Sequence, residues 1–201
     1  RKREILETAS ELIDEHGYED TTIEMIINGI GIAKGTFYHY FRSKDDLLNT
    51  LVDELIEEVT NSIKEITDRD ENAITKMFAL STYFRTLAIG REQFTDYLHE
   101  EKNAHIHMKI EKRVTPPLVD CYTKLVEQGN EEGTFNAKYP SETAMALMGA
   151  AQFLVEGQHD HVDRDHIDPQ KSIAAMDIFE RMLGMERGAM LEYMNKEEER
   201  K

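Results

Sequence analysis

The sequence predicts an all-α protein, and three observations support this fold class. The chain of 201 residues contains only 4 prolines and 11 glycines, so few positions interrupt a helix. Hydrophobic residues make up 40% of the chain and recur at helical spacing over long stretches, which is enough for a packed core. Charged residues make up 32% and lie between the apolar positions, as on the solvent faces of amphipathic helices.

The first predicted element is an amphipathic helix over residues 2–16. Apolar residues recur every three or four positions on one face, and acidic residues occupy the other. Gly17 then supplies a left-handed stop. The apolar face comprises Ile5, Leu6, Ala9, Leu12 and Ile13, and the acidic face comprises Glu4, Glu7, Glu11 and Asp14.

A second, short helix is predicted to begin near Thr22. The preceding Thr21 and the following Glu24 give this start the form of a capping box, in which hydroxyl and carboxylate each bind a backbone amide. The helix ends at Gly29 and Gly31, because two glycines permit the positive φ angles of a tight turn.

A third helix of about two turns is predicted from Ala33 or Lys34 to Tyr40. Ser43 then opens a fourth helix as its N-cap, and the acidic residues that follow favour the start of a helix. Apolar spacing continues to about residue 68, and at about 1.5 Å per residue this helix is about 40 Å long. It is long enough to link two domains rigidly.

Further helices are predicted over the rest of the chain. A helix over residues 104–128 contains Pro116 and Pro117, which cannot donate backbone hydrogen bonds and should kink or divide it. The last two predicted helices, 140–155 and 169–183, are candidates for a four-helix dimer interface, and packing in a monomer core is the alternative. Two more helices are expected before these, over residues 74–88 and around residues 94–98.

Charge distribution indicates where a polyanion can bind. The formal net charge of −16 argues against nucleic-acid binding by the whole surface, since such binding needs Lys and Arg at phosphates. Residues 25–44, however, contain no Asp or Glu and carry Lys34, Arg42 and Lys44. A helix that enters the major groove needs short or hydrogen-bonding groups and no carboxylates on its exposed side. The third helix meets this demand, so the first helices are predicted to form a helix-turn-helix.

These residues resemble the TetR/AcrR family of transcriptional repressors. The resemblance implies a DNA-binding domain over residues 1–46, a linker helix over 43–68, and a larger helical domain over 47–201 that binds an inducer and dimerises. Ile27, Ile30 and Ala33 depart from the family pattern and affect helix packing and capping. The matching positions are Ile26, Gly31-Ile32, Gly35-Thr36-Phe37-Tyr38, Tyr40-Phe41 and Ser43-Lys44.

Each candidate DNA-binding residue has an expected role. Thr22 and Lys44, at helix N-termini, are expected to bind phosphates and so position the protein. Lys34 can reach guanine and Thr36 a thymine methyl. Gly35 allows close approach to the DNA backbone, and Tyr38, His39 and Tyr40 are expected to divide between base edges and phosphates. The alternative for Tyr38 and Tyr40 is that they are core aromatics.

A pocket for a small molecule follows only from the resemblance, since no motif marks one. Aromatic residues and methionines of the larger domain are candidates for its lining, because methionine adapts to variable ligands. Each of them is also explained as an ordinary core residue. The candidates are Phe84, Tyr97, Met108, Tyr122, Met145 and Met148.

Two clusters of histidines in the sequence leave a metal-binding function as an alternative. His159, His161 and His166 offer ligands for zinc, which would make the protein a metal-sensing repressor or a zinc-dependent hydrolase. A polar loop between helices is the alternative. His99, His105 and His107 form the other cluster, but residues two apart on a helix point to different faces.

The sequence lacks a nucleophile motif, a HExxH helix and a phosphate-binding glycine loop, so an enzyme is not expected. A helical adaptor protein is a third class. Cys121 is the only cysteine, which excludes an intrachain disulfide. The charged N-terminus has no apolar signal region, and no apolar stretch is long enough for a membrane span. We therefore expect a cytoplasmic homodimer without a cofactor, with double-stranded operator DNA and an inducer as partners.

Overall fold

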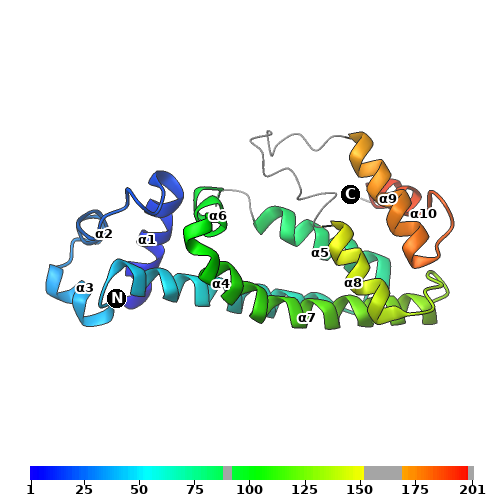
Figure 1. Cartoon of the computed structure of the whole chain (residues 1–201), viewed down its shortest axis with the longest axis horizontal. Coiled ribbons are helices and arrows are strands. Elements are labelled where there is room, and N and C mark those ends of the chain that lie inside the picture. The colour runs from blue at the N-terminus through cyan, green and yellow to red at the C-terminus, as the bar shows by residue number, and fades with distance from the viewer. Residues whose placement is uncertain (88–91, 152–168, 199–201) are drawn as a thin grey trace. The chain divides into compact units, whose positions relative to one another are not determined.

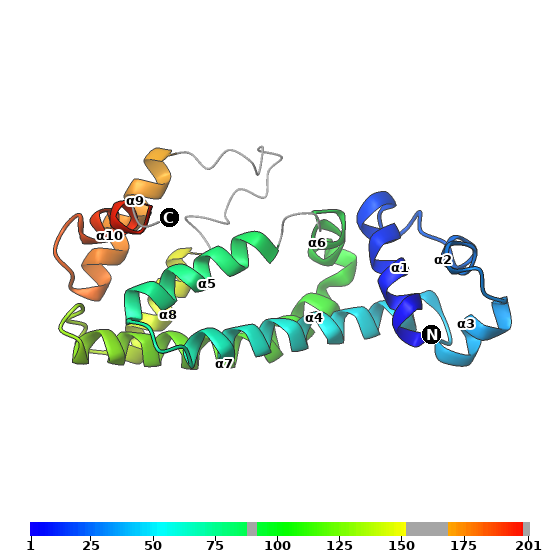
Figure 2. The same ribbon diagram turned by 180° about the vertical axis from the view of Figure 1, so that it is seen from behind.

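The structure, a computed structural model, describes residues 1–87, 92–151 and 169–198, and within these ranges it consists of helices without strands. No helix in the described ranges is long and apolar enough to cross a membrane. Figures 1 and 2 show the order of the elements. These are α1 (Lys2–His16), α2 (Ile23–Ile30), α3 (Lys34–Tyr40), α4 (Lys44–Thr67), α5 (Ala73–Leu87), α6 (Glu92–His99), the 3-10 helix η1 (Glu101–Asn103), α7 (Ala104–Glu131), α8 (Pro140–Ala151), α9 (Pro169–Leu183) and α10 (Ala189–Glu198).

The chain divides into two compact units. Unit 1 comprises residues 1–63 and 80–116, and unit 2 comprises residues 64–79 and 117–201. Helices α4, α5 and α7 contribute residues to both units. The predicted boundary after residue 46 remains a prediction. Unit 1 therefore contains α6 and η1 together with the N-terminal helices, although α6 and η1 come much later in the sequence.

The core of unit 1 holds α3 in place from one side. Phe37 and Phe41 are 0% and 1% exposed and pack with α1 and α2. A second cluster joins α1 and α4 to α6 through Tyr18 and Tyr97. The first cluster comprises Ile5, Leu6, Ala9, Ile26, Ile27, Phe37, Phe41 and Leu47, and the second comprises Ile13, Tyr18, Leu48, Val52, Ile56, Phe94, Tyr97, Leu98 and Ile106.

The start of α2 differs from the prediction. Thr22 is the N-cap, and its hydroxyl oxygen accepts a hydrogen bond from the Met25 amide at 3.1 Å. Thr21 is fully buried, and its hydroxyl donates to the carbonyl oxygens of Leu12 (3.1 Å) and Gly17 (2.8 Å). The predicted capping role of Thr21 was therefore wrong. The hydroxyl, whose single proton is shared between the two carbonyls, instead attaches Thr21 to the last turns of α1 and to Gly17.

The ends of the next helices follow local sequence rules. Gly31, with a φ of 72°, closes α2 in the left-handed conformation. Ala33 is the N-cap of α3 and makes no side-chain cap, as expected from its lack of a polar group. The Ser43 hydroxyl oxygen accepts from the Asp46 amide at 3.1 Å at the start of α4, which confirms the predicted cap.

Helix α7 continues through its two prolines. It extends unbroken from Ala104 to Glu131, so of the two predicted effects of Pro116 and Pro117, a kink or a division, the division does not occur. Each proline leaves a carbonyl one turn earlier without its helical donor, namely those of Lys112 and Arg113. Both of these residues are exposed. Water can therefore bind the two carbonyls, and the helix need not end.

Two buried polar side chains organise unit 2. Glu180 of α9 is 2% exposed, and its carboxylate accepts from the amides of Gly188 (2.7 Å) and Met190 (2.8 Å). It thereby caps the start of α10, a helix that is not among those predicted. Lys76 of α5 is 6% exposed and donates to the Thr67 carbonyl at 2.9 Å and to Gln128 Oε1 at 3.1 Å.

We predict that Glu180→Ala lowers the free energy of unfolding by about 3 kcal/mol, because two amides at the start of α10 lose a charged acceptor. Urea denaturation followed by circular dichroism measures this. Glu186→Ala is the control, since Glu186 is exposed and lies in the same turn. Equal stability of the two variants would show that the carboxylate does not hold α10.

Candidate nucleic-acid interface

Helix α3 presents aromatic side chains to solvent while it is anchored from behind. Phe37 and Phe41 are buried, and their ring centroids lie 5.7 Å apart. Tyr38 is 47% exposed and Tyr40 is 38% exposed. His39 is also exposed and meets the Tyr40 ring edge to face at 4.9 Å. The two tyrosines are thus surface residues, which removes the alternative that they belong to the core.

The small and hydroxyl residues predicted for this site also lie at the surface of α2 and α3. A Cβ atom at Gly35 would meet no heavy atom within 4 Å, so the backbone there is open to an approaching molecule. Thr22 is exposed at the N-terminus of α2, and Thr36 is half-buried. The N-terminal end of α3 is therefore accessible to a nucleic-acid groove.

Lys34 is held by a carboxylate on the neighbouring helix. Its ammonium lies 2.6 Å from Glu24 Oε1, and both side chains are 59% exposed. The hydrogen bond and the opposite charge raise the pKa of Lys34 and lower that of Glu24. Glu24 lies just before the acid-free segment of residues 25–44. Sequence spacing gave no signal of this pair, because the two residues are on different helices.

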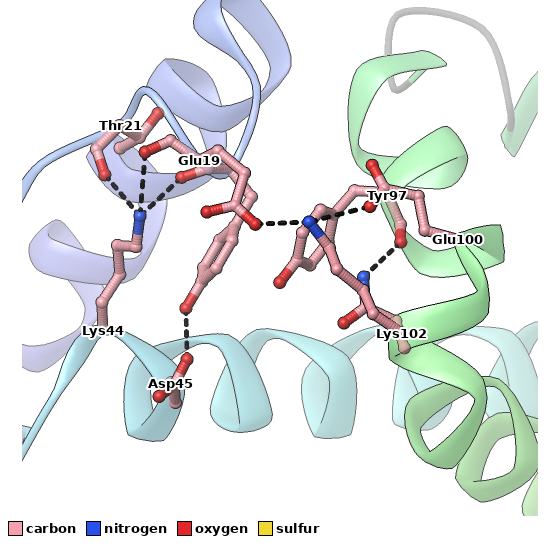
Figure 3. Close-up of polar contacts among 9 residues, drawn as sticks. Glu19, Thr21, Lys44, Asp45, Tyr97, Glu100 and Lys102 are labelled. Atoms are coloured by element: carbon pink, nitrogen blue, oxygen red, sulfur yellow. Dashed lines mark hydrogen bonds and ion pairs between the residues drawn. The ribbon is translucent and has the colours of Figure 1, made fainter.

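Lys44 occupies a different position from the one expected (Figure 3). Its ammonium donates to the carbonyl oxygens of Tyr18 (2.8 Å), Glu19 (3.2 Å) and Thr21 (3.0 Å). It also lies 4.2 Å from the centroid of the Tyr18 ring. An ammonium has three N–H donors, and here each has an acceptor. Binding of a phosphate by Lys44 remains a prediction, and it would compete with these bonds.

The same turn is attached to α6 and η1, as Figure 3 shows. The Tyr18 hydroxyl donates to Asp45 Oδ1 at 2.8 Å, and burial raises the pKa of this tyrosine. The rings of Tyr18 and Tyr97 lie 4.5 Å apart, and Tyr97 belongs to α6. Lys102 of η1 forms ion pairs with Glu19 at 2.6 Å and with Glu100 at 2.9 Å. Two polar contacts and one aromatic contact therefore converge on the α1–α2 turn.

The six candidate pocket residues are placed in both units. Phe84, Tyr97 and Met108 belong to unit 1, where Tyr97 is buried in the core and Met108 is 50% exposed. The other three belong to unit 2, where Met145 is 51% exposed and Tyr122 and Met148 are half-buried. Their role in ligand binding remains a prediction.

None of the six candidates lines either of two cavities in the described part of the chain. The first has a volume of about 420 Å³ and lies in unit 2, and the second has a volume of about 190 Å³ and lies in unit 1. Sequence reasoning missed both linings, because most of these residues read as ordinary helix faces. Asn72, Ile74, Glu132, Thr134, Met185, Ala189 and Tyr193 line the first, and Leu6, Glu7, Ser10, Ile13, Leu51, Glu54, Leu55, Glu58 and Phe94 line the second.

The histidine clusters provide no described metal site. His159, His161 and His166 lie outside the described residues. His105 and His107 are exposed on α7. Among the residues that the structure describes, no group of three or more His, Cys, Asp or Glu side chains is arranged to hold a metal ion.

We predict that Lys44→Met lowers the free energy of unfolding by about 3 kcal/mol, because three carbonyls lose a charged donor and the Tyr18 ring loses its cation. Thermal or urea unfolding measures the change. Lys64→Met is a matched control at an exposed position of α4. If both variants unfold alike, the bonds of Lys44 contribute nothing to stability.

Known proteins resemble this chain over both of its parts. Residues 5–51 match the family model of bacterial regulatory proteins of the tetR family, and residues 85–177 match that of a tetracyclin repressor-like C-terminal domain. The chain is 30% identical over 139 residues to the HTH-type transcriptional repressor KstR2 of Mycobacterium tuberculosis, covering 67% of this chain and 69% of that protein. It is 24% identical over 178 residues to YhgD, an uncharacterised HTH-type transcriptional regulator of Bacillus subtilis, covering 83% and 90%.

Solved structures show the same architecture. A transcriptional regulator of the TetR/AcrR family from Thermobifida fusca superposes with a TM-score of 0.66 at 22% identity, covering 93% of this chain and 98% of that one. The predicted all-α fold, with a helix-turn-helix followed by a larger helical domain, is thus confirmed. The chain belongs to the TetR family of bacterial regulatory proteins, whose members are ligand-responsive DNA-binding transcriptional regulators.

Proposed function

We propose that the protein is a homodimeric repressor that inserts α3 into the major groove of operator DNA and is released by a small-molecule inducer. The observation that carries this proposal is the outward face of α3, where Tyr38, His39 and Tyr40 are exposed and no carboxylate occurs within the helix. Buried Phe37 and Phe41 hold this face rigidly. A rigid, carboxylate-free helix is what groove entry requires.

The roles in DNA binding follow from position. Residues at the N-terminal end of a recognition helix reach base edges, so Lys34 and Thr36 are assigned to base contact, with Gly35 allowing close approach. Tyr38, His39 and Tyr40 extend the contact along the groove. Thr22, at the N-terminus of α2, is assigned to a phosphate.

Dimerisation is part of the proposal, because the two α3 recognition helices of a dimer would match two DNA half-sites about 34 Å apart. Apolar side chains exposed on α8 and α9 support it. Met145 of α8 is 51% exposed and Ile173 of α9 is 58% exposed. The two helices also pack against each other within unit 2. Their exposed faces are available for a second copy of the chain.

Release by an inducer requires a connection between the inducer domain and the DNA-binding helices. Helix α6 and η1 lie within residues 85–177, which match the C-terminal family domain, yet they belong to unit 1. Their contacts with the α1–α2 turn, between Tyr97 and Tyr18 and between Lys102 and Glu19, supply such a connection. An inducer that favours a conformer with these contacts altered would weaken DNA binding by linkage.

Fluorescence anisotropy with a labelled duplex from the region upstream of the protein's own gene tests this function. We predict salt-dependent binding, stronger than to an unrelated duplex of equal length. Lys34→Ala and Tyr38→Ala should each weaken binding by about tenfold or more, because each removes a groove contact. Lys64→Ala, an exposed change on α4, should not. Unchanged binding in both α3 variants would exclude α3 as the reading helix.

A second prediction concerns Glu24, whose carboxylate holds Lys34 beside the reading face. Glu24→Gln should tighten binding to the same duplex several-fold, because it frees Lys34 and removes a charge that repels phosphates. Glu65→Gln, an exposed change on α4, has the same charge difference and serves as control. Weaker binding by the Glu24 variant would show instead that the ion pair positions Lys34 for base contact.

A further inference from the structure

Most of the Lys and Arg side chains near α3, the proposed recognition helix, have partners within the protein. The first 50 residues, all of which the structure describes, contain six Lys and Arg residues. Arg1 pairs with Glu4 at 2.5 Å, and Arg3 pairs with Glu7 at 2.7 Å. Lys34 pairs with Glu24, and Lys44 donates to three carbonyls. Each of these four cations thus already has an acceptor within the protein, with which a phosphate would compete.

Lys2 and Arg42 are the two that remain within this stretch. Both are exposed. Lys2 Nζ lies 5.7 Å from the centroid of the Phe41 ring, and Arg42 follows Phe41 directly in the chain. Phe41 is buried at the end of α3, so the Lys2 ammonium lies beside the residue that directly precedes Arg42. The first turn of α1 thus places one cation next to the end of α3, where Arg42 follows 40 positions later in the chain.

The carboxylates nearest to these cations in the chain have other partners. Asp46 Oδ2 accepts from the backbone amide of Arg42 at 2.9 Å, and Asp45 accepts from the Tyr18 hydroxyl at 2.8 Å. Glu4 is bound by Arg1. None of these three carboxylates forms an ion pair with the side chain of Lys2 or Arg42 in the described part of the chain.

We propose that Lys2 and Arg42 form a phosphate clamp at the C-terminal end of the reading helix. The clamp rests on the proposed function and adds two phosphate-contacting residues to it. Base edges are reached from the N-terminal part of such a helix, while the groups that follow it meet the sugar-phosphate backbone. Lys2 contributes a point charge, and the Arg42 guanidinium contributes a planar fork that binds phosphate through two N–H groups. Together they fix the register of α3 without reading sequence.

The salt dependence of DNA binding tests the clamp, because each lost phosphate contact makes the plot of log affinity against log salt shallower by about 0.9. The probes are the labelled upstream duplex and an unrelated duplex, titrated with the full-length dimer. Lys2→Gln and Arg42→Gln should each reduce the slope by about two per dimer and weaken binding to both duplexes by a similar factor. Lys2→Arg and Arg42→Lys should retain most of the slope.

The control is Lys112→Gln, which changes the charge equally at an exposed position of α7 and should leave the slope unchanged. Melting temperatures confirm that the variants remain folded. If the wild-type protein binds with a steep salt dependence and neither glutamine variant reduces the slope, the clamp is wrong, but the proposed function stands. Absence of wild-type binding at low salt would overturn the proposed function, and the clamp with it. A shallower slope for Lys44→Gln, with no change for Lys2→Gln or Arg42→Gln, would assign the phosphate contact to Lys44 instead.

Discussion

The DNA-binding helices depend on one interaction, the insertion of the Lys44 ammonium into the α1–α2 turn. The end of α1 leaves carbonyls without helical donors, and the turn adds more. Lys44 donates to the carbonyls of Tyr18, Glu19 and Thr21, and the buried Thr21 hydroxyl adds a hydrogen bond shared between those of Leu12 and Gly17. A cation from α4 thereby ties α1, the turn and the start of α2 to one another. Without it, these three carbonyls would lose their charged donor.

The distribution of charge in the protein follows from the same constraint. A chain with 40 acidic and 24 basic residues can bind a polyanion only where acids are absent or neutralised. On the proposed function, Lys44 and Lys34 each already have an acceptor within the protein, so other cations would have to supply phosphate contacts. The same scarcity would keep non-specific binding weak, and specific contacts in the groove would then account for a larger share of the affinity.

Local rules predicted much of the fold, and long-range contacts account for the rest. The Ser43 cap, the Gly31 turn and the exposure of Tyr38 and Tyr40 follow from neighbours within a few residues. The bonds of Lys44 and the Lys34–Glu24 pair join different helices, so spacing could not show them. Helix α10 was missed because its cap is supplied by Glu180 from α9. The pocket candidates were chosen by residue type, which does not distinguish a lining residue from a core residue such as Tyr97.

The contacts of α6 and η1 suggest that the effect of an inducer on DNA binding and the affinity for DNA itself depend on different interactions. On the proposed route, α6 and η1 contact the α1–α2 turn by an ion pair and by an aromatic contact. The Lys102–Glu19 pair is exposed, with side chains 51% and 62% accessible, so salt screens it and it contributes little. The Tyr18–Tyr97 contact is buried and depends on packing rather than charge. Inducer coupling should therefore persist at salt concentrations that weaken binding to phosphates, because the two processes rest on different physical interactions.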